Sequence, residues 1–269
     1  MELTKRDVAV LEALEKWGVM GLGQLDGFLF RTGAAEAERA RLFFNDLRRE
    51  DYWGGAYKRL RTLEEAGLVR TFRAVNYCQV YMLTGRGHAC LREHGRASYT
   101  HPIRGVGEPY LRHEIAVCAV GLVMTEFLGL EVQATRQIWE NQRRRAVLRR
   151  GAPKQIFPDL LAKDAFNEWH SIEVELTAKS RERYRELLYK RERRWEQGMV
   201  LYLTGWPTAV EYLLPLMEKS QSVRTYAASL TDFRKSLGRC QYLRQTTYGH
   251  RSTFILPAIK EPARQEVAA

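Results

Sequence analysis

Apolar residues recur at helical spacing at the start of the chain. Residues 4–17 read as a helix, because three apolar side chains are separated by three positions each, Thr4 can cap the first turn and Gly18 can end the last. Two further helical patterns follow, over 20–30 and over the charged, alanine-rich stretch 31–52. The chain therefore begins with helices rather than with strands.

The next pattern is typical of a winged helix-turn-helix. Residues 55–67 predict a helix with Leu60 and Leu63 facing inward and Gly67 at its end. Two short strands and one more short helix are expected after it, at 68–74, 79–84 and 87–94. In this fold the third helix enters the major groove of DNA.

The predicted third helix and its hairpin carry the candidate DNA contacts. Arginine and lysine side chains there can reach phosphates or guanine edges. The candidates are Tyr57, Lys58, Arg59 and Arg61 on the helix, and Arg70 and Arg73 on the hairpin. The alternative is a winged helix that docks a protein and whose basic face is only solvated.

The second half predicts an α/β domain with a mixed sheet. The expected helices cover 110–128, 178–197 and 208–219, and the expected strands cover 130–139, 156–162, 169–176, 199–203 and 224–229. The segment 140–154 reads as a basic loop, in which Arg143, Arg144 and Arg145 are further candidate DNA contacts. The predicted organisation is a winged helix-turn-helix at 1–98, a linker at 99–109, the α/β domain at 110–256 and a flexible tail at 257–269.

Composition and charge narrow the classes of function. The chain has 269 residues and a formal charge of +11, which favours an acidic partner such as nucleic acid. An apolar fraction of 45% excludes a wholly disordered chain, and no apolar run reaches the roughly 18 residues of a membrane span. Charged residues occupy the N-terminus where a signal peptide has its apolar core, so we expect a cytoplasmic protein that does not bind membranes.

A carboxylate cluster is the main chemical signal. Asp159 precedes one predicted strand, and Glu173 and Glu175 stand two apart on the next, so both glutamates project to the same face. If the two strands pair, Asp159 lies beside the second strand. Three carboxylates there would repel one another unless a cation joined them, and Mg²⁺ or Mn²⁺ suits such oxygen ligands. Lys179 and Lys190 lie further along the chain and could neutralise a phosphodiester's charge.

These residues resemble the PD-(D/E)xK, restriction-endonuclease-like superfamily. The resemblance implies a nuclease-like fold with Asp159 and Glu173 as metal ligands and Glu114, on the preceding helix, as a further acidic ligand. The chain departs from the motif at Glu175, where the superfamily usually has its catalytic lysine. Some active members carry glutamate at this position or take the lysine from the following helix, so Lys179 or Lys190 could substitute. Many other members have lost cleavage and only bind DNA.

The whole arrangement is also similar to the replication-relaxation family of bacterial mobile elements. The matching segments are LTKRDVAVLEAL, RLRTLEEAGLV and VYMLTGRG in the first half, and RHEIAV, FPDLL and IEVELTAKS in the second. The similarity covers about residues 3–205. It implies a role in relaxing or initiating replication of plasmid or integrated conjugative DNA, beside other replication or relaxosome proteins.

Three functions remain open at the level of sequence. The first is a double-stranded-DNA-binding accessory protein with a degenerate nuclease domain and no cofactor. The second is an endonuclease or nickase that depends on Mg²⁺ or Mn²⁺, and the third is a transcriptional regulator. In the structural alternative for the carboxylates, the glutamates form salt bridges with the next helix. Homodimerisation is open as well.

Overall fold

The computed structural model is described for residues 2–45, 54–73, 79–97, 99, 108–146, 157–194, 198–206, 208–219, 224–245 and 250–259. Contacts divide it into two compact units, one formed by 1–122 with 134–153 and one by 123–133 with 154–269. The expected linker falls largely outside the described residues. Within them, no helix has the length and apolar composition needed to cross a membrane.

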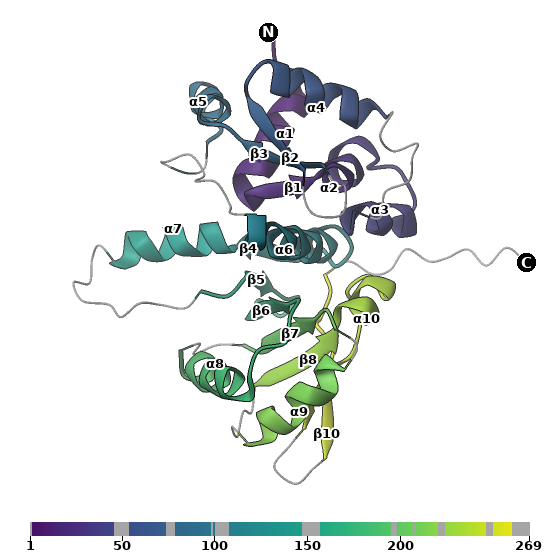
Figure 1. The fold of residues 1–269 in the computed structure, drawn as a ribbon, viewed down its shortest axis with the longest axis vertical. Helices are drawn as coiled ribbons and strands as arrows, with labels where there is room; N and C mark the ends of the chain where they lie inside the picture. Colours follow the sequence, from purple (N-terminus) through teal and green to yellow (C-terminus); the bar gives the residue numbers. More distant parts are fainter. Residues whose placement is uncertain are drawn as a thin grey trace, which may run out of the picture. The chain divides into compact units, whose positions relative to one another are not determined.

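The first unit combines helices with a small three-stranded antiparallel sheet (Figure 1). Its strands are β1 (Val19–Gly21), β2 (Val69–Arg73) and β3 (Gln79–Leu83), in the order β1-β3-β2. Its helices are α1 (Lys5–Trp17), α2 (Leu22–Leu25), the π-helix η1 (Asp26–Phe30), α3 (Glu36–Phe43), α4 (Gly55–Glu65), α5 (Gly85–Glu93), the greater part of α6 (Glu108–Glu126) and α7 (Thr135–Ala146).

The predicted ends of α1 and α4 are confirmed. The Thr4 side chain accepts a hydrogen bond from the Asp7 amide and the Asp7 carboxylate accepts one from the Thr4 amide, which completes a capping box at the start of α1. Gly18 and Gly67 follow the two helices with positive φ angles of 79° and 72°, a conformation that suits glycine. The apolar side of α4 is fully buried, as expected for Leu60.

Gly121 of α6 lies directly against Trp17 of α1. A Cβ atom at Gly121 would come within 2.3 Å of the Trp17 ring, closer than any real contact. We therefore expect Gly121→Ala to lower the free energy of unfolding by about 1–3 kcal/mol, because the indole must shift. Gly85→Ala is the control, since nothing lies within 4 Å of its added methyl group. Urea denaturation of both variants tests this, and equal stability would contradict it.

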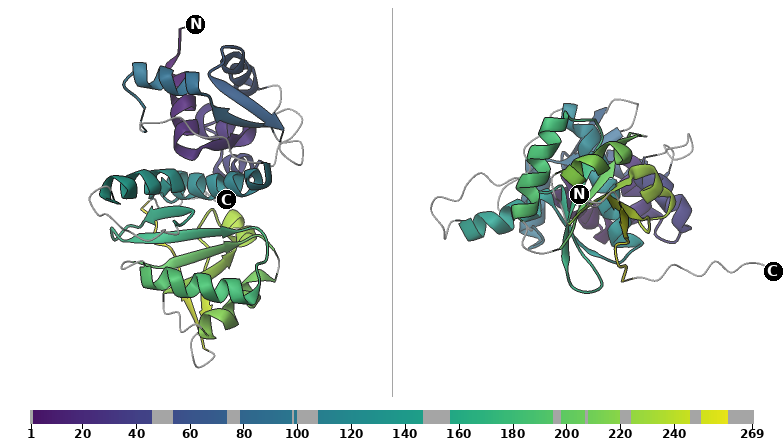
Figure 2. Two further views of the ribbon diagram at one scale, coloured as in Figure 1. Left: turned by 60° about the vertical axis from the view of Figure 1, so that its left-hand side comes forward. Right: turned by 90° about the horizontal axis from the view of Figure 1, so that it is seen from below.

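The second unit is a seven-stranded mixed sheet with helices (Figures 1 and 2). The strand order is β10-β9-β8-β7-β6-β5-β4, in which β6, β7 and β8 are parallel neighbours and β5 is antiparallel to β6. The strands are β4 (Glu131–Ala134), β5 (Leu160–Lys163), β6 (Trp169–Glu175), β7 (Val200–Thr204), β8 (Thr225–Ser229), β9 (Tyr242–Gln245) and β10 (Arg251–Phe254), and the helices are α8 (Arg181–Arg194), α9 (Ala209–Lys219) and α10 (Leu230–Lys235).

Helices α8 and α9 pack against one face of this sheet (Figure 2). Tyr184 and Leu188 of α8 are buried with Tyr202 of β7 and Leu213 of α9. Tyr184 and Leu188 thus belong to the core of this unit. The face of the sheet that carries Tyr202 is therefore covered by helices.

The sequence-based prediction was wrong between residues 130 and 146. The strand expected over 130–139 ends at Ala134, and Thr135 begins α7, which replaces the first part of the expected loop. The Gln137 side chain accepts a hydrogen bond from the Ala134 amide at 3.1 Å, which stabilises the new helix start. Good helix formers dominate the segment from Arg136 to Ala146, and their propensity outweighs the apolar alternation before it.

Two smaller differences have a similar local cause. The three-residue strand β1 occupies the start of the expected helix 20–30, because a run of three residues is too short to show a period. The elements α10, β9 and β10 extend the sheet unit beyond the last predicted strand.

Candidate functional site

The predicted pairing of the two strands around the carboxylates is confirmed. Leu160 pairs with Ile172 in the antiparallel β5–β6 ladder, and the same register continued by one residue places Asp159 opposite Glu173. One oxygen of Asp159, Oδ2, accepts a hydrogen bond from the Val174 amide at 2.8 Å. Asp159 is thereby fixed against β6 at the residue that separates the two glutamates.

Glu173 and Glu175 lie on the face of the sheet that helices cover. In the parallel β6–β7 ladder Glu173 pairs with Tyr202 and Glu175 with Thr204, and paired residues project to the same face. Both glutamates are buried, with exposed fractions of 4% and 6%, whereas Asp159 is half-buried.

Lys179 neutralises Glu175. Its ammonium group forms an ion pair with Glu175 Oε2 and lies 5.7 Å from the centre of the Tyr184 ring. Burial and the Glu175 charge both raise the pKa of the Tyr184 hydroxyl, so it stays protonated. The Lys179 carbonyl accepts a hydrogen bond from the Tyr212 hydroxyl at 3.4 Å, which joins the start of α8 to α9. Neither tyrosine contact was predicted from the sequence.

The structure does not test the roles predicted for Glu114 and Lys190. Glu114 belongs to the first unit, where its carboxylate lies 3.7 Å from His113 Nδ1. Lys190 is a residue of α8, and its side chain lies outside the described atoms. Their roles as ligand and catalytic lysine stay predictions.

A different trio has its ligand atoms close together. The ligand atoms of Asp164, Glu168 and His170 lie within 4.8 Å of one another. Among the described residues, the ligand atoms of Asp159, Glu173 and Glu175 do not all come this close together.

Both ring nitrogens of His170 are already used within the protein. Nδ1 accepts a hydrogen bond from the Met199 amide at 3.0 Å, so Nε2 must carry the proton that it shares with Asp164 Oδ2, also at 3.0 Å. Asp164 Oδ1 accepts from the amides of Phe166 and Glu168. The trio therefore closes the β5–β6 turn, and a metal would have to break these bonds.

Asp164 is expected to stabilise the fold in a pH-dependent way. Burial alone would raise the pKa of its carboxyl group, but hydrogen bonds from His170 and from the Glu168 and Phe166 amides outweigh burial and lower it below 3.8. A lowered pKa stabilises the fold above the unfolded value, and this stabilisation disappears as the pH falls through the folded value. Asp164→Asn should thus cost about 1–2 kcal/mol near neutral pH and progressively less below about pH 4. Urea denaturation across this range tests it, and a difference that stays constant with pH would contradict it.

The candidate DNA contacts of the first unit differ in how exposed their side chains are and in the ion pairs that they form. Lys58, Arg61 and Arg70 are exposed, and Arg61 forms an ion pair with Glu65, which is exposed as well, at 3.0 Å. Tyr57 is half-buried. The side chains of Arg73, Arg143, Arg144 and Arg145 lie outside the described atoms, although the last three belong to α7 and not to a loop.

Arg59 is held by a buried carboxylate. Its guanidinium group makes a two-point ion pair with Asp7, whose side chain is fully buried. Burial alone would raise the pKa of the Asp7 carboxyl group, but hydrogen bonds from Arg59 and Thr4 and the Arg59 charge lower it overall. Asp7 thus joins the start of α1 to α4.

Fold and site together define a two-unit α/β protein, with a basic helix in the first unit and carboxylates on a mixed sheet in the second. The model of the Replication-relaxation family matches residues 11–200, which is more than half of the chain. The chain belongs to the Replication-relaxation family, as its motifs had indicated. Searches of curated proteins and of solved structures returned no match.

Proposed function

We propose that this chain is a double-stranded-DNA-binding accessory protein in the replication or relaxation of plasmid or conjugative-element DNA. Family membership supports a role in replication or relaxation. Expected partners are duplex DNA and other replication or relaxosome proteins.

The observation that carries the proposal is the exposed basic side of α4. Lys58 and Arg61 face solvent while Leu60 and Leu63 are fully buried, so the helix presents its cations outward. The β2–β3 hairpin follows α4 and carries exposed Arg70, which lies 4.8 Å from the Phe72 ring centre. A helix followed by such a hairpin is the arrangement of a winged helix, in which α4 enters the major groove and Arg70 contacts a neighbouring phosphate.

Arg59 has a structural role in this proposal. A DNA contact would require its guanidinium group to leave Asp7, and a buried aspartate without its partner is costly. We therefore assign DNA contact to Tyr57, Lys58, Arg61 and Arg70, and assign to Arg59 the anchoring of α4.

Binding of the full-length chain to a fluorescent 30-base-pair duplex, followed by anisotropy, tests the proposal. In about 0.1 M salt we expect a dissociation constant of micromolar order or lower. Contacts to phosphates alone, without recognition of the base sequence, can give an affinity close to this value. An unlabelled duplex should compete better than a single strand of equal length. Absence of binding at about 100 μM protein would contradict the proposal.

In the second unit we propose a nuclease-like domain that has lost cleavage. Glu175 stands where the superfamily has its lysine, and the Lys179 ammonium group compensates its charge within the chain. Glu173 is buried on the helix-covered face of the sheet, with 4% of its surface exposed. Such a site can preserve the fold and the charge balance of a nuclease without admitting a phosphodiester.

The donor atoms do fit a hard cation. The Val174 amide orients Asp159 through Oδ2, and the paired strands place the Asp159 carboxylate opposite that of Glu173. These two residues would hold Mg²⁺ or Mn²⁺, which prefers carboxylate oxygens. A bound ion would supply Lewis acidity toward a phosphate. Lys179 would have to leave its ion pair with Glu175 to reach a phosphate oxygen.

This fit supports a second candidate function, a metal-dependent endonuclease or nickase. Supercoiled plasmid incubated with the purified chain and Mn²⁺ decides between the two. The proposed accessory function predicts no nicking above the background of the Asp159→Ala variant. Nicking by the natural chain that the variant loses would instead establish the nuclease, and nicking equal in both would exclude this site as its source.

A further inference from the structure

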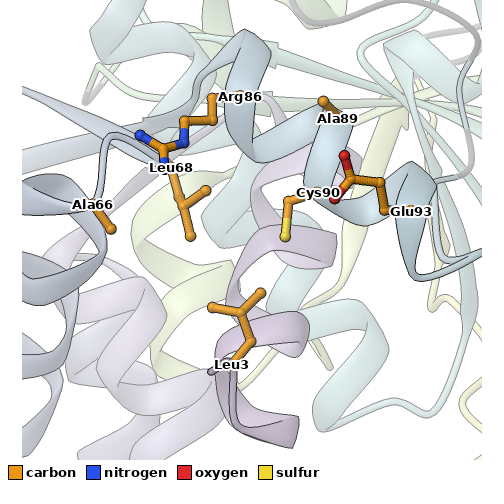
Figure 3. Close-up of a pocket in the computed structure, with 7 residues that line it drawn as sticks. All are labelled: Leu3, Ala66, Leu68, Arg86, Ala89, Cys90 and Glu93. Carbon is orange, nitrogen blue, oxygen red and sulfur yellow. The ribbon is translucent and has the colours of Figure 1, made fainter. Parts of the chain in front are cut away.

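A pocket of about 330 Å³ lies in the first unit, apart from the carboxylates and from the exposed side of α4 (Figure 3). It is formed by the segment before α1, the turn between α4 and β2, and one side of α5. The lining residues are Leu3, Ala66, Leu68, Arg86, Ala89, Cys90 and Glu93. Its size falls in the range of pockets that bind small molecules.

The lining combines an aliphatic wall with two opposite charges. Figure 3 shows Arg86 and Glu93 on opposite sides of Cys90, whose sulfur atom points toward Leu3. Arg86 and Glu93 are seven positions apart on α5, so their backbones are separated by about 10 Å along the helix. Within the described part of the chain, neither the Arg86 nor the Glu93 side chain forms a hydrogen bond or an ion pair.

The charges also affect the thiol between them. Burial raises the pKa of Cys90, the Glu93 carboxylate raises it further, and Arg86 acts in the opposite direction. Both charged groups therefore act on the space around the sulfur atom, although they do not neutralise each other. A ligand with a single charge could pair with only one of Arg86 and Glu93. Its apolar part would then lie against the other charged group.

We propose that this pocket binds a small zwitterion with an aliphatic body. Its anionic end pairs with Arg86, its cationic end pairs with Glu93, and its carbon chain packs on Leu3 and Leu68. Short aliphatic peptides and ω-amino acids have this chemistry. Ala66 is the C-cap residue of α4, so the ligand would contact the end of that helix.

The test uses 6-aminohexanoate as the probe, with hexanoate and hexylamine as analogues that lack one charge each. Binding to the full-length chain is followed by isothermal calorimetry and by the rate at which iodoacetamide alkylates Cys90, read by peptide mass spectrometry. We expect millimolar binding of the zwitterion, as a ligand of this size allows, and slower alkylation of Cys90. Hexanoate and hexylamine should bind at least about fivefold more weakly.

Variants then assign the two charges. Arg86→Gln and Glu93→Gln should each weaken binding of 6-aminohexanoate at least about fivefold, which corresponds to the loss of one charged contact. Arg92→Gln, an exposed cation on the same helix outside the lining, is the matched control and should bind normally. Equal binding of all three probes, unchanged binding by Arg86→Gln, or failure of 6-aminohexanoate to protect Cys90 would overturn the proposal.

Discussion

Replacing Arg59 with alanine is expected to lower the free energy of unfolding by about 3 kcal/mol. The reason is not the loss of an arginine contact as such. Asp7 is fully buried, and among the described residues the Thr4 hydrogen bonds are what its charge keeps without the guanidinium group. Chemical denaturation near neutral pH measures the change.

Arg61→Ala is the matched control for this prediction. It removes an arginine two positions along the same helix, but the Arg61–Glu65 pair is exposed and should contribute less than about 1 kcal/mol. The pH dependence supplies a second test. The folded pKa of Asp7 is lowered, so its stabilisation is present above 3.8 and is lost as the pH falls through the folded value. Equal losses in the two variants would show that Asp7 does not depend on Arg59.

The second large effect concerns DNA. The triple variant Lys58→Gln, Arg61→Gln and Arg70→Gln is expected to bind duplex DNA roughly 100-fold more weakly at about 0.1 M salt, because it loses three cations that we propose contact phosphates. All three side chains are exposed, so the fold should be retained. Anisotropy with the same fluorescent duplex measures the change, and circular dichroism verifies folding.

The control for the triple variant has the same net charge. It replaces three exposed cations elsewhere with glutamine: Arg92, Lys219 and Lys235. A general attraction between a basic protein and DNA would weaken both variants equally. A loss confined to the first variant would instead locate the binding surface on α4 and β2, and equal losses would contradict that assignment.

Sequence patterns predicted the elements that have a clear period or a clear end. The capping box of Thr4 and Asp7, the stop at Gly67 and the pairing of the strands around Asp159 all follow from a few neighbouring residues. Such features depend on local chemistry, which a single sequence displays. The strand expected over 130–139 was wrong because the helix propensity of the residues after Ala134 outweighs the apolar alternation before them.

The ionic partners could not have been predicted in the same way. Arg59 and Arg61 look alike in the sequence, yet one holds a buried aspartate from 52 positions away and the other an exposed glutamate on its own helix. The pair of Lys179 with Glu175 is local, but the burial of Glu175 depends on α8 and on the parallel strand β7. Which charges are compensated inside the protein is therefore decided by packing between distant segments.

The salt dependence of duplex binding tests most directly whether the basic first unit binds DNA. The logarithm of the association constant is measured against the logarithm of the salt concentration for the full-length natural chain. Neutralisation of five or six phosphates predicts a linear decrease with a slope of about −5. A slope near zero, with binding that salt does not weaken, would contradict the proposed function.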